Sequence, residues 1–478
     1  MDFTSGGTWA FLYLASEWVI RIIMVVVVPF RRSPEAAKGW LLLVFFLPLP
    51  ALVLYWLIGR PTFPAWRHER FTRLPDAFAG VRARLADDLR RERPDLPANL
   101  AQAATLAQNL GHLAPLRGNT VELLPEYDAS IDRLVADIDQ ARDHAHLLYY
   151  IFADDATAQK VIDALGRAVA RGVTCRVLLD ALGSRHWAKS TLAKLAAVGV
   201  AAHRVLPVAF FRRHSARADL RNHRKIAVID GRVGYTGSQN LVYSAFKPGI
   251  TYQEMVVRVT GPVVLELQAV FAGDWFMETE EALTGADLFP PPEDAGPVIA
   301  QLLPSGPDYP TTSVQRLIVA LIHGARERVV LTTPYFIPDD ALIQALETAV
   351  LRGVEVHLTV SKIADQLLVS LAQRSYYTQL LNCGVKIHLF RDKFLHAKHL
   401  SIDGALCLIG SSNLDMRSFT LNAEASLLVY DAGVTARLRA EQERNWSNCD
   451  LLVLETWEKR RLASKVCENL ARLVGPLL

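Results

Sequence analysis

Cysteine is scarce in this chain, with 5 residues in 478, and neither sign of charge is in clear excess, since 52 Lys and Arg stand against 49 Asp and Glu. The cysteines have no metal-ligand spacing, so we predict scattered, mostly buried thiols in a reducing compartment. A net charge of +3 argues against a dedicated nucleic-acid-binding protein. The chain has 51% hydrophobic and 21% charged residues. This composition excludes a disordered chain, a collagen-like chain and a disulfide-rich miniprotein.

The chain is instead rich in apolar sequence near its start. Gly39–Gly59 carries no charge and would span roughly 30 Å as a helix, the thickness of a bilayer's hydrocarbon core. An earlier apolar run, Thr8–Phe30, contains Glu17 and Arg21, which lie one helical turn apart and can pair. We therefore predict a membrane anchor over residues 1–60, made of two transmembrane helices or of a re-entrant hairpin kinked at its central prolines, Pro48 and Pro50.

The orientation of this anchor is not fixed by its flanks. Basic residues follow both apolar segments, so the positive-inside rule barely separates the two topologies. The cysteines expected to be reduced favour a cytoplasmic main body.

After a polar helical connector over residues 61–120, helical and β-rich runs alternate, which indicates an α/β fold. The same order occurs twice, as strand, helix and strand: Leu147–Phe152, Gln159–Arg171 and Thr174–Asp180, then Val329–Thr333, Leu342–Arg352 and Val354–Val360. Short identical segments occur at matching places in the two copies: Ala141-Arg142 with Ala325-Arg326, Asp154-Asp155 with Asp339-Asp340, and Arg171-Gly172 with Arg352-Gly353. This repetition predicts a duplicated domain, with repeats over residues 121–290 and 295–478.

Each repeat carries the same motif, H-x-K-x4-D-x6-G-S-x-N. Its residues are His223, Lys225, Asp230, Ser238 and Asn240 in the first repeat, and His396, Lys398, Asp403, Ser411 and Asn413 in the second. Alternate side chains of a strand share a face, so each His and Lys pair points the same way.

An imidazole beside an ammonium makes a site for a phosphate. The Lys neutralises phosphate oxygens, and the His acts as nucleophile or proton donor. The Ser and Asn side chains can donate further hydrogen bonds to the phosphate. Each Asp precedes a Gly, so we also expect Asp230 and Asp403 to form the turn after the strand.

The paired motif resembles that of the phospholipase D superfamily, and the chain as a whole resembles the bacterial cardiolipin synthases within it. The likeness includes Tyr149-Tyr150-Ile151-Phe152, Pro334-Tyr335-Phe336, Asp415-Met416-Arg417-Ser418-Phe419 and the closing Gly475-Pro476-Leu477-Leu478. It implies two phospholipase D-like α/β/α repeats that form one catalytic body with pseudo-two-fold symmetry, preceded by a transmembrane helical hairpin. It also implies an acidic residue downstream of each motif that orients the histidine. Glu424 and Glu254 match those places, although an Asp is usual at the position of Glu254.

The resemblance further implies a location in the bacterial inner membrane and a two-step transfer between two phosphatidylglycerol molecules, giving cardiolipin and glycerol. By analogy His223 is the nucleophile, forming a phosphohistidine, and His396 is the acid and base. The sequence alone does not break this symmetry. No cofactor or metal is implied, because Lys225 and Lys398 supply the positive charge. Neither a nucleic-acid partner nor a fixed oligomeric state is expected, and a homo-oligomer is compatible with the sequence.

Two segments suggest contact with lipid. Clustered aromatic and basic residues suit an anionic lipid surface, although a solvated basic loop is an equal alternative: Phe210, Phe211, Arg212, Arg213 and Arg217. Residues 457–473 predict an amphipathic helix, which we expect to pack against the catalytic body.

Two other functions use the same motifs. A hydrolase with water as acceptor would be a phospholipase D or a nuclease, and the apolar start and low net charge disfavour the nuclease. A catalytically inactive membrane scaffold is disfavoured by the intact His, Lys and Asn of both motifs.

Overall fold

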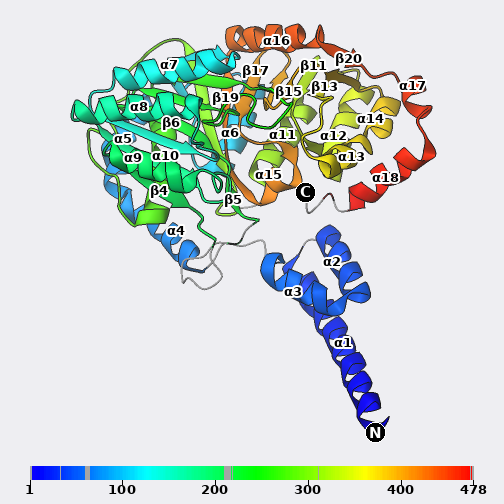
Figure 1. Ribbon diagram of the computed structural model, residues 1–478. Helices are drawn as coiled ribbons and strands as arrows, with labels where there is room; N and C mark the ends of the chain where they lie inside the picture. The colour runs from blue at the N-terminus through cyan, green and yellow to red at the C-terminus, as the bar shows by residue number, and fades with distance from the viewer. Residues whose placement is uncertain are drawn as a thin grey trace.

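One long mixed sheet runs through the main body of the molecule, with helices on both of its faces (Figure 1). The computed structural model describes residues 3–32, 34–59, 65–208, 217, 219–309, 312–473 and 475. Lipid-surface candidates Phe210, Phe211, Arg212 and Arg213 lie outside these ranges.

Strands and helices alternate in the same way in both repeats. The first contains β1 (Leu116–Leu124), α7 (Tyr127–Asp139), β2 (His144–Tyr149), α8 (Ala156–Ala170), β3 (Thr174–Asp180), α9 (Ala188–Ala197), β4 (Ala201–Val205), β6 (Lys225–Ile229), β7 (Val233–Gly237), β9 (Val256–Thr260) and α10 (Val263–Thr279). The second contains β10 (Val298–Ser305), α11 (Ser313–Gly324), β11 (Arg328–Thr332), α12 (Asp340–Leu351), β13 (Glu355–Ser361), α13 (Leu367–Arg374), α14 (Tyr377–Cys383), β14 (Lys386–Phe390), β16 (His399–Ile402), β17 (Leu406–Gly410), α15 (Met416–Thr420), β19 (Asn422–Tyr430), α16 (Ala432–Trp446) and β20 (Cys449–Leu451).

The strand order reads the same outward from the centre of the sheet. On one side it runs β10, β19, β17, β16, β11, β13 and β14, and on the other β1, β9, β7, β6, β2, β3 and β4. Corresponding strands thus lie at equal distances from the antiparallel junction of β1 and β10. This arrangement confirms the predicted α/β fold of two repeats related by a pseudo-two-fold axis.

Both faces of the sheet are buried, which is why its central strands are apolar throughout rather than alternating. In β2, Leu147 packs in a core with α7 and α8, while its neighbour Leu148 packs in a second core with α10. Neither residue retains measurable exposure.

The repeats align slightly differently from the sequence match. Asp155 caps the N-terminus of α8 by accepting from the amide of Ala158 at 2.9 Å, and Asp339 caps α12 by accepting from that of Leu342 at 3.0 Å. The predicted match of Asp154-Asp155 with Asp339-Asp340 is therefore one residue out of register.

The chain begins with α1 (Phe3–Arg31), which projects from the body (Figure 1). Its segment Thr8–Arg31 has 24 residues, and the most apolar 18-residue window within it has a mean hydropathy of 2.1, with 11% of that window buried. By length and composition this segment is sufficient to cross a membrane. Arg21 forms the expected ion pair with Glu17 at 3.2 Å.

The second apolar segment is broken into α2 (Pro34–Phe46) and α3 (Pro48–Ile58). Leu47 between them has φ −136° and ψ 69°, outside the helical region, and Pro48 starts the new helix because it has no amide N–H to donate. The rings of Trp40 and Tyr55 pack edge to face with their centroids 5.2 Å apart. They belong to one apolar cluster with Met24 and Val28, in the C-terminal half of α1. A second continuous transmembrane helix is thus a wrong prediction, whereas the kink at the prolines is present.

Three helices link the anchor to the body: α4 (Ala65–Ala77), α5 (Ala79–Arg91) and α6 (Ala98–Gly111). In α4, Arg67 and Arg70 form ion pairs with Glu278 at 2.6 Å and Glu280 at 2.5 Å, at the end of α10. α6 packs against β10 and α11 of the second repeat. The linking helices are therefore fixed to both repeats.

The chain ends with α17 (Leu454–Glu458) and the amphipathic α18 (Leu462–Leu473), which lies on the side of the body nearer to α2 (Figure 1). Glu468 and Ala471 are buried, and Glu468 pairs with Arg374 of α13 at 3.0 Å. The larger apolar side chains of α18 point outward and are exposed: Leu462, Val466, Leu470 and Leu473. The helix packs on the body as expected, but not through its apolar face.

Candidate active site

A cavity of about 600 Å³ lies where the two repeats meet, and both motif histidines line it. Short strands that cross between the repeats place them there. β5 (Arg221–Asn222) pairs with the start of β19, and β15 (Phe394–Leu395) pairs with β8 (Tyr252–Gln253). The crossing continues into the histidines, since the amide of His223 donates to Ala423 O at 2.8 Å and that of His396 to Gln253 O at 2.7 Å.

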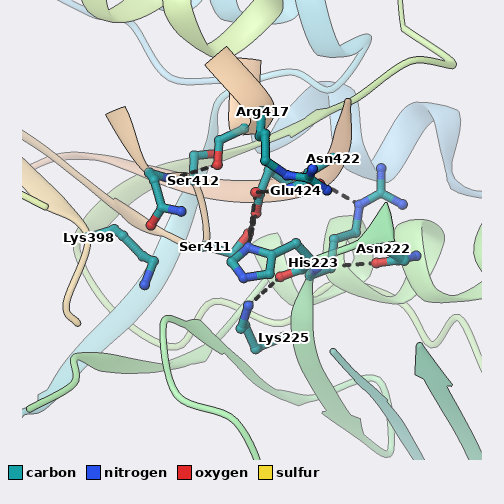
Figure 2. A network of polar contacts seen from close by, with 12 residues as sticks. Asn222, His223, Lys225, Lys398, Ser411, Ser412, Arg417, Asn422 and Glu424 are labelled. Atoms are coloured by element: carbon teal, nitrogen blue, oxygen red, sulfur yellow. Dashed lines mark hydrogen bonds and ion pairs between the residues drawn. The ribbon is translucent and has the colours of Figure 1, made fainter. Parts of the chain in front are cut away.

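Each histidine is held by a glutamate of the other repeat. Both carboxylate oxygens of Glu424 lie 3.0 Å from Nδ1 of His223, and Glu254 Oε1 lies 2.6 Å from Nδ1 of His396. Figure 2 shows the first of these pairs together with Ser411, whose hydroxyl donates to the same carboxylate. Because Nδ1 is engaged in both rings, Nε2 is the nitrogen left for the cavity.

The electrostatics of the two pairs follow from burial. Burial lowers the pKa of His223 to about 4, with Lys225 acting in the same direction and Glu424 opposing it. Burial also lowers the pKa of His396. The pKa of each glutamate is lowered too, because its histidine and a nearby lysine stabilise the carboxylate more than burial disfavours it.

The two lysines lie deep beside the histidines. Lys225 Nζ donates to His223 O at 2.6 Å, and Lys398 Nζ donates to His396 O at 2.5 Å (Figure 2 shows the first contact). Burial and mutual repulsion lower the pKa of Lys225 to about 7, and burial lowers that of Lys398 to about 8. An anion in the cavity would restore the favourable environment that these ammonium groups lack.

The predicted hydrogen-bond donors divide into two groups. Asn240 and Asn413 line the cavity. Ser238 and Ser411 have no exposure: Ser238 bonds to the backbone of Met255, and Ser411 bonds to Glu424 and the backbone of Ala425. The structure therefore places these serines behind the glutamates, and the prediction that they contact phosphate is wrong.

Asp230 and Asp403 also lie away from the cavity. Asp230 accepts from the amides of Arg142, Asp143 and His144 at 2.9, 2.8 and 2.9 Å. Asp403 does the same for residues 326–328 at 2.7, 2.8 and 2.9 Å. Both residues have a left-handed backbone, with φ 54° and 48°. This geometry corrects their grouping with the catalytic residues. Both form the expected turn, and their carboxylates bind that turn to the starts of β2 and β11.

Aromatic and charged side chains that the motif does not contain complete the cavity. The ring centroid of Tyr150 lies 4.9 Å from that of His223, and Tyr252 lies 5.5 Å from His396. The remaining lining includes Arg185, Lys247, Tyr335, Asp365 and Arg417. Tyr150, Tyr335 and Arg417 belong to segments that carried the family resemblance. Arg185, Lys247 and Asp365 lie in loops with no sequence signal.

Arg224, inside the first motif, supports the site from behind. It donates to Glu424 O at 3.1 Å and Ser305 O at 3.2 Å and pairs with Asp274 at 2.5 Å. Its counterpart in the second repeat is Ala397, so this support exists in the first repeat alone.

Arg217 is the one described member of the predicted lipid surface, and it pairs with Asp219. In the parts of the chain that the structure describes, no group of three or more His, Cys, Asp or Glu residues could hold a metal ion.

Two histidine-lysine strands that meet at a pseudo-two-fold axis define a phospholipase D-like enzyme. The structure is similar to that of a phosphatidylserine synthase from Haemophilus influenzae, with a TM-score of 0.56. The match includes 80% of this chain and 100% of the synthase chain. At 16% sequence identity, this likeness shows the fold.

Comparison of the sequence narrows the class to a family. The family model "Cardiolipin synthase, PLD-like domain" matches residues 134–275 and 318–446. Cardiolipin synthase A of Yersinia pseudotuberculosis is 35% identical over 99% of this chain and 97% of its own, and that of Pectobacterium carotovorum is 34% identical over the same shares. The chain belongs to the cardiolipin synthase family of phospholipase D-like enzymes.

Proposed function

We propose that the protein condenses two phosphatidylglycerol molecules to cardiolipin and glycerol through a phosphohistidine. The observation that carries this proposal is the meeting of His223 and His396, each with its own lysine and glutamate, in one cavity of a chain from this family.

In the first step, Nε2 of His223 attacks phosphorus and the bond between phosphorus and the glycerol oxygen breaks. His396, protonated on Nε2, gives that proton to the departing oxygen, and free glycerol leaves. The lowered pKa of His223 suits the nucleophile, because an unprotonated nitrogen is required. A bound phosphodiester anion raises the pKa of His396, and Glu254 stabilises its charged ring.

In the second step, His396 removes a proton from a hydroxyl of the second phosphatidylglycerol. The alkoxide oxygen attacks phosphorus, the phosphorus–nitrogen bond breaks, and its electron pair returns to His223. Lys225 and Lys398 stabilise the charge on the phosphate oxygens in both steps, and Asn240 and Asn413 can donate hydrogen bonds to them.

The alternative acceptor is water, which would make the protein a phospholipase D that releases phosphatidic acid. Incubation of the purified protein with phosphatidylglycerol in mixed micelles, followed by mass spectrometry, separates the two activities. Cardiolipin with an equal amount of glycerol supports the proposal, and phosphatidic acid without cardiolipin supports hydrolysis. No turnover of either kind would support the inactive scaffold.

The order of the two histidines has its own test. A substrate labelled in the phosphatidyl group should leave acid-labile label on the wild-type protein and none on His223→Ala. Label that persists in His223→Ala but disappears in His396→Ala would exchange the two roles.

We also place the protein at the bacterial inner membrane with its body on the cytoplasmic side. The support is the exposed apolar length of α1, the exposed apolar face of α18, and five cysteines that are all free. In this proposal α1 anchors the chain, while α18 lies in the interface beside it. Phosphatidylglycerol and cardiolipin are then reached from the membrane itself.

A further inference from the structure

Two equivalent loops, one from each repeat, line the cavity, and they differ in chemistry. Each follows the third strand of its repeat, and strand pairing makes Asp180 at the end of β3 the counterpart of Ser361 at the end of β13. Four and five residues further on, Ser184 and Arg185 of the first loop correspond to Asp365 and Gln366 of the second.

The first loop's end of the cavity is cationic. Arg185 donates to His186 and Arg417 donates to Asp219 O, and within the described residues neither guanidinium forms an ion pair with a carboxylate. Both act electrostatically on Tyr150, against the opposing effect of Asp180, and the Tyr150 ring lies 4.9 Å from that of His223. Two arginines without a carboxylate partner suit the phosphate of a substrate.

The second loop's end is polar but balanced in charge. Asp365 Oδ2 accepts from Lys247 at 2.7 Å, from the hydroxyl of Tyr335 at 2.8 Å and from that of Tyr252 at 3.4 Å. The carboxylate side chain is 3% exposed, and all three contacts use one oxygen, so acceptor capacity is left on the carboxylate. Gln366 Nε2 donates to the hydroxyl of Tyr335 at 3.2 Å, so a donor stands beside it.

The polar cluster around Asp365 packs against the ring of His396. The rings of Tyr252 and Tyr335 lie 5.5 and 6.5 Å from the ring of His396, and both hydroxyls contact Asp365. A group held by Asp365 is therefore next to the histidine that exchanges a proton with the glycerol oxygen.

We propose that Asp365 and Gln366, held by Tyr252, Tyr335 and Lys247, form the subsite for the glycerol headgroup, with Asp365 accepting a hydrogen bond from the hydroxyl that does not react. This inference rests on the proposed function and adds the choice of acceptor to it. A carboxylate oxygen is a good acceptor for a hydroxyl, whereas the guanidinium groups of Arg185 and Arg417 favour a phosphate, so the phosphate is directed to the arginines and the polyol to His396. The leaving glycerol and the incoming headgroup use the same subsite, because the second step reverses the first.

The test uses a donor that needs no glycerol subsite, phosphatidyl-p-nitrophenol, with glycerol or 1-propanol as soluble acceptor. Release of p-nitrophenol reports formation of the phosphohistidine, and the ratio of phosphatidylglycerol to phosphatidylpropanol reports the choice of acceptor. We expect the wild-type full-length protein to prefer glycerol about ten- to hundredfold, the range of a hydrogen bond to a charged group. Asp365→Asn should lose most of that preference, and because the ratio compares two acceptors on one phosphohistidine, it is independent of how fast the phosphohistidine forms.

Two further variants keep the test decisive. Gln366→Leu alters an exposed side chain and should lower the same ratio, so it serves if Asp365→Asn does not fold. Arg185→Gln changes the equivalent position of the first loop and should slow p-nitrophenol release while leaving the ratio unchanged. A ratio unchanged in both Asp365→Asn and Gln366→Leu overturns the subsite. Failure of the wild-type protein to form cardiolipin from phosphatidylglycerol overturns the proposed function instead.

Discussion

Glu424 of the second repeat holds Nδ1 of His223 in the first repeat, 201 residues away in sequence, with both carboxylate oxygens at 3.0 Å. The reciprocal pair, Glu254 and His396, spans 142 residues. Neither repeat therefore contains a complete histidine-glutamate pair, and the catalytic unit is the whole chain.

The two glutamates should act on different steps. With phosphatidyl-p-nitrophenol, whose leaving group needs no acid, Glu424→Gln should slow p-nitrophenol release roughly 10²- to 10⁴-fold, because His223 loses the partner that orients it. Glu254→Gln should retain most of the p-nitrophenol release in the first turnover, which needs no acid, but lose cardiolipin formation from phosphatidylglycerol. Equal losses in both assays for both variants would contradict separate roles for the histidines.

Inactive variants should not rescue one another. His223→Ala and His396→Ala, purified separately and mixed in micelles, are expected to remain without cardiolipin synthesis, since each cavity needs both histidines of one chain. Co-expression of the two variants gives the matched control. Recovery of activity in either experiment would show that repeats of different chains form the site.

The pH dependence should place the optimum of kcat/KM on the acidic side of neutrality. His223 must be unprotonated, and its pKa of about 4 makes activity rise as the pH increases through that value. His396 must be protonated to act as the acid, and its lowered pKa makes activity fall as the pH increases through that value. Lys225 must be charged, and its pKa of about 7 adds a further fall at higher pH. Initial rates of glycerol release between pH 4 and 9 check this, and a profile that still rises above pH 8 would contradict it.

Asp230 should matter for stability rather than for chemistry. Asp230→Ala removes the acceptor of three amides and puts an alanine at φ 54°, so we expect about 2–4 kcal/mol less free energy of unfolding. Asp230→Asn tolerates that backbone and keeps one acceptor oxygen, so its loss should be smaller. Thermal unfolding in detergent measures the stability of both variants. A loss of activity at unchanged stability would contradict the structural role and show that Asp230 acts in the active site.

The fold and the two histidine-lysine pairs could be predicted from the sequence because they depend on local order and on a repeated spacing. The exchange of Glu254 and Glu424 could not, since each glutamate follows its own motif by a similar distance, 31 residues after His223 and 28 after His396, which fits pairing within a repeat equally well. The positions of Ser238 and Ser411 behind the glutamates could not be predicted either, because the sequence does not show which way a hydroxyl within the motif points. The second apolar segment has the composition of a membrane span and also contains Pro48, so its sequence fits a continuous span and a kinked hairpin alike, and the structure shows the kink.

The palindromic sheet also has an evolutionary consequence. A sheet that reads alike from its centre is what two identical subunits would form around a dyad, with each subunit lending its glutamate to the other's histidine. Within one chain that exchange requires the motif in both halves. The loops around it are under no such requirement, and Ser184 and Asp365 differ at equivalent positions.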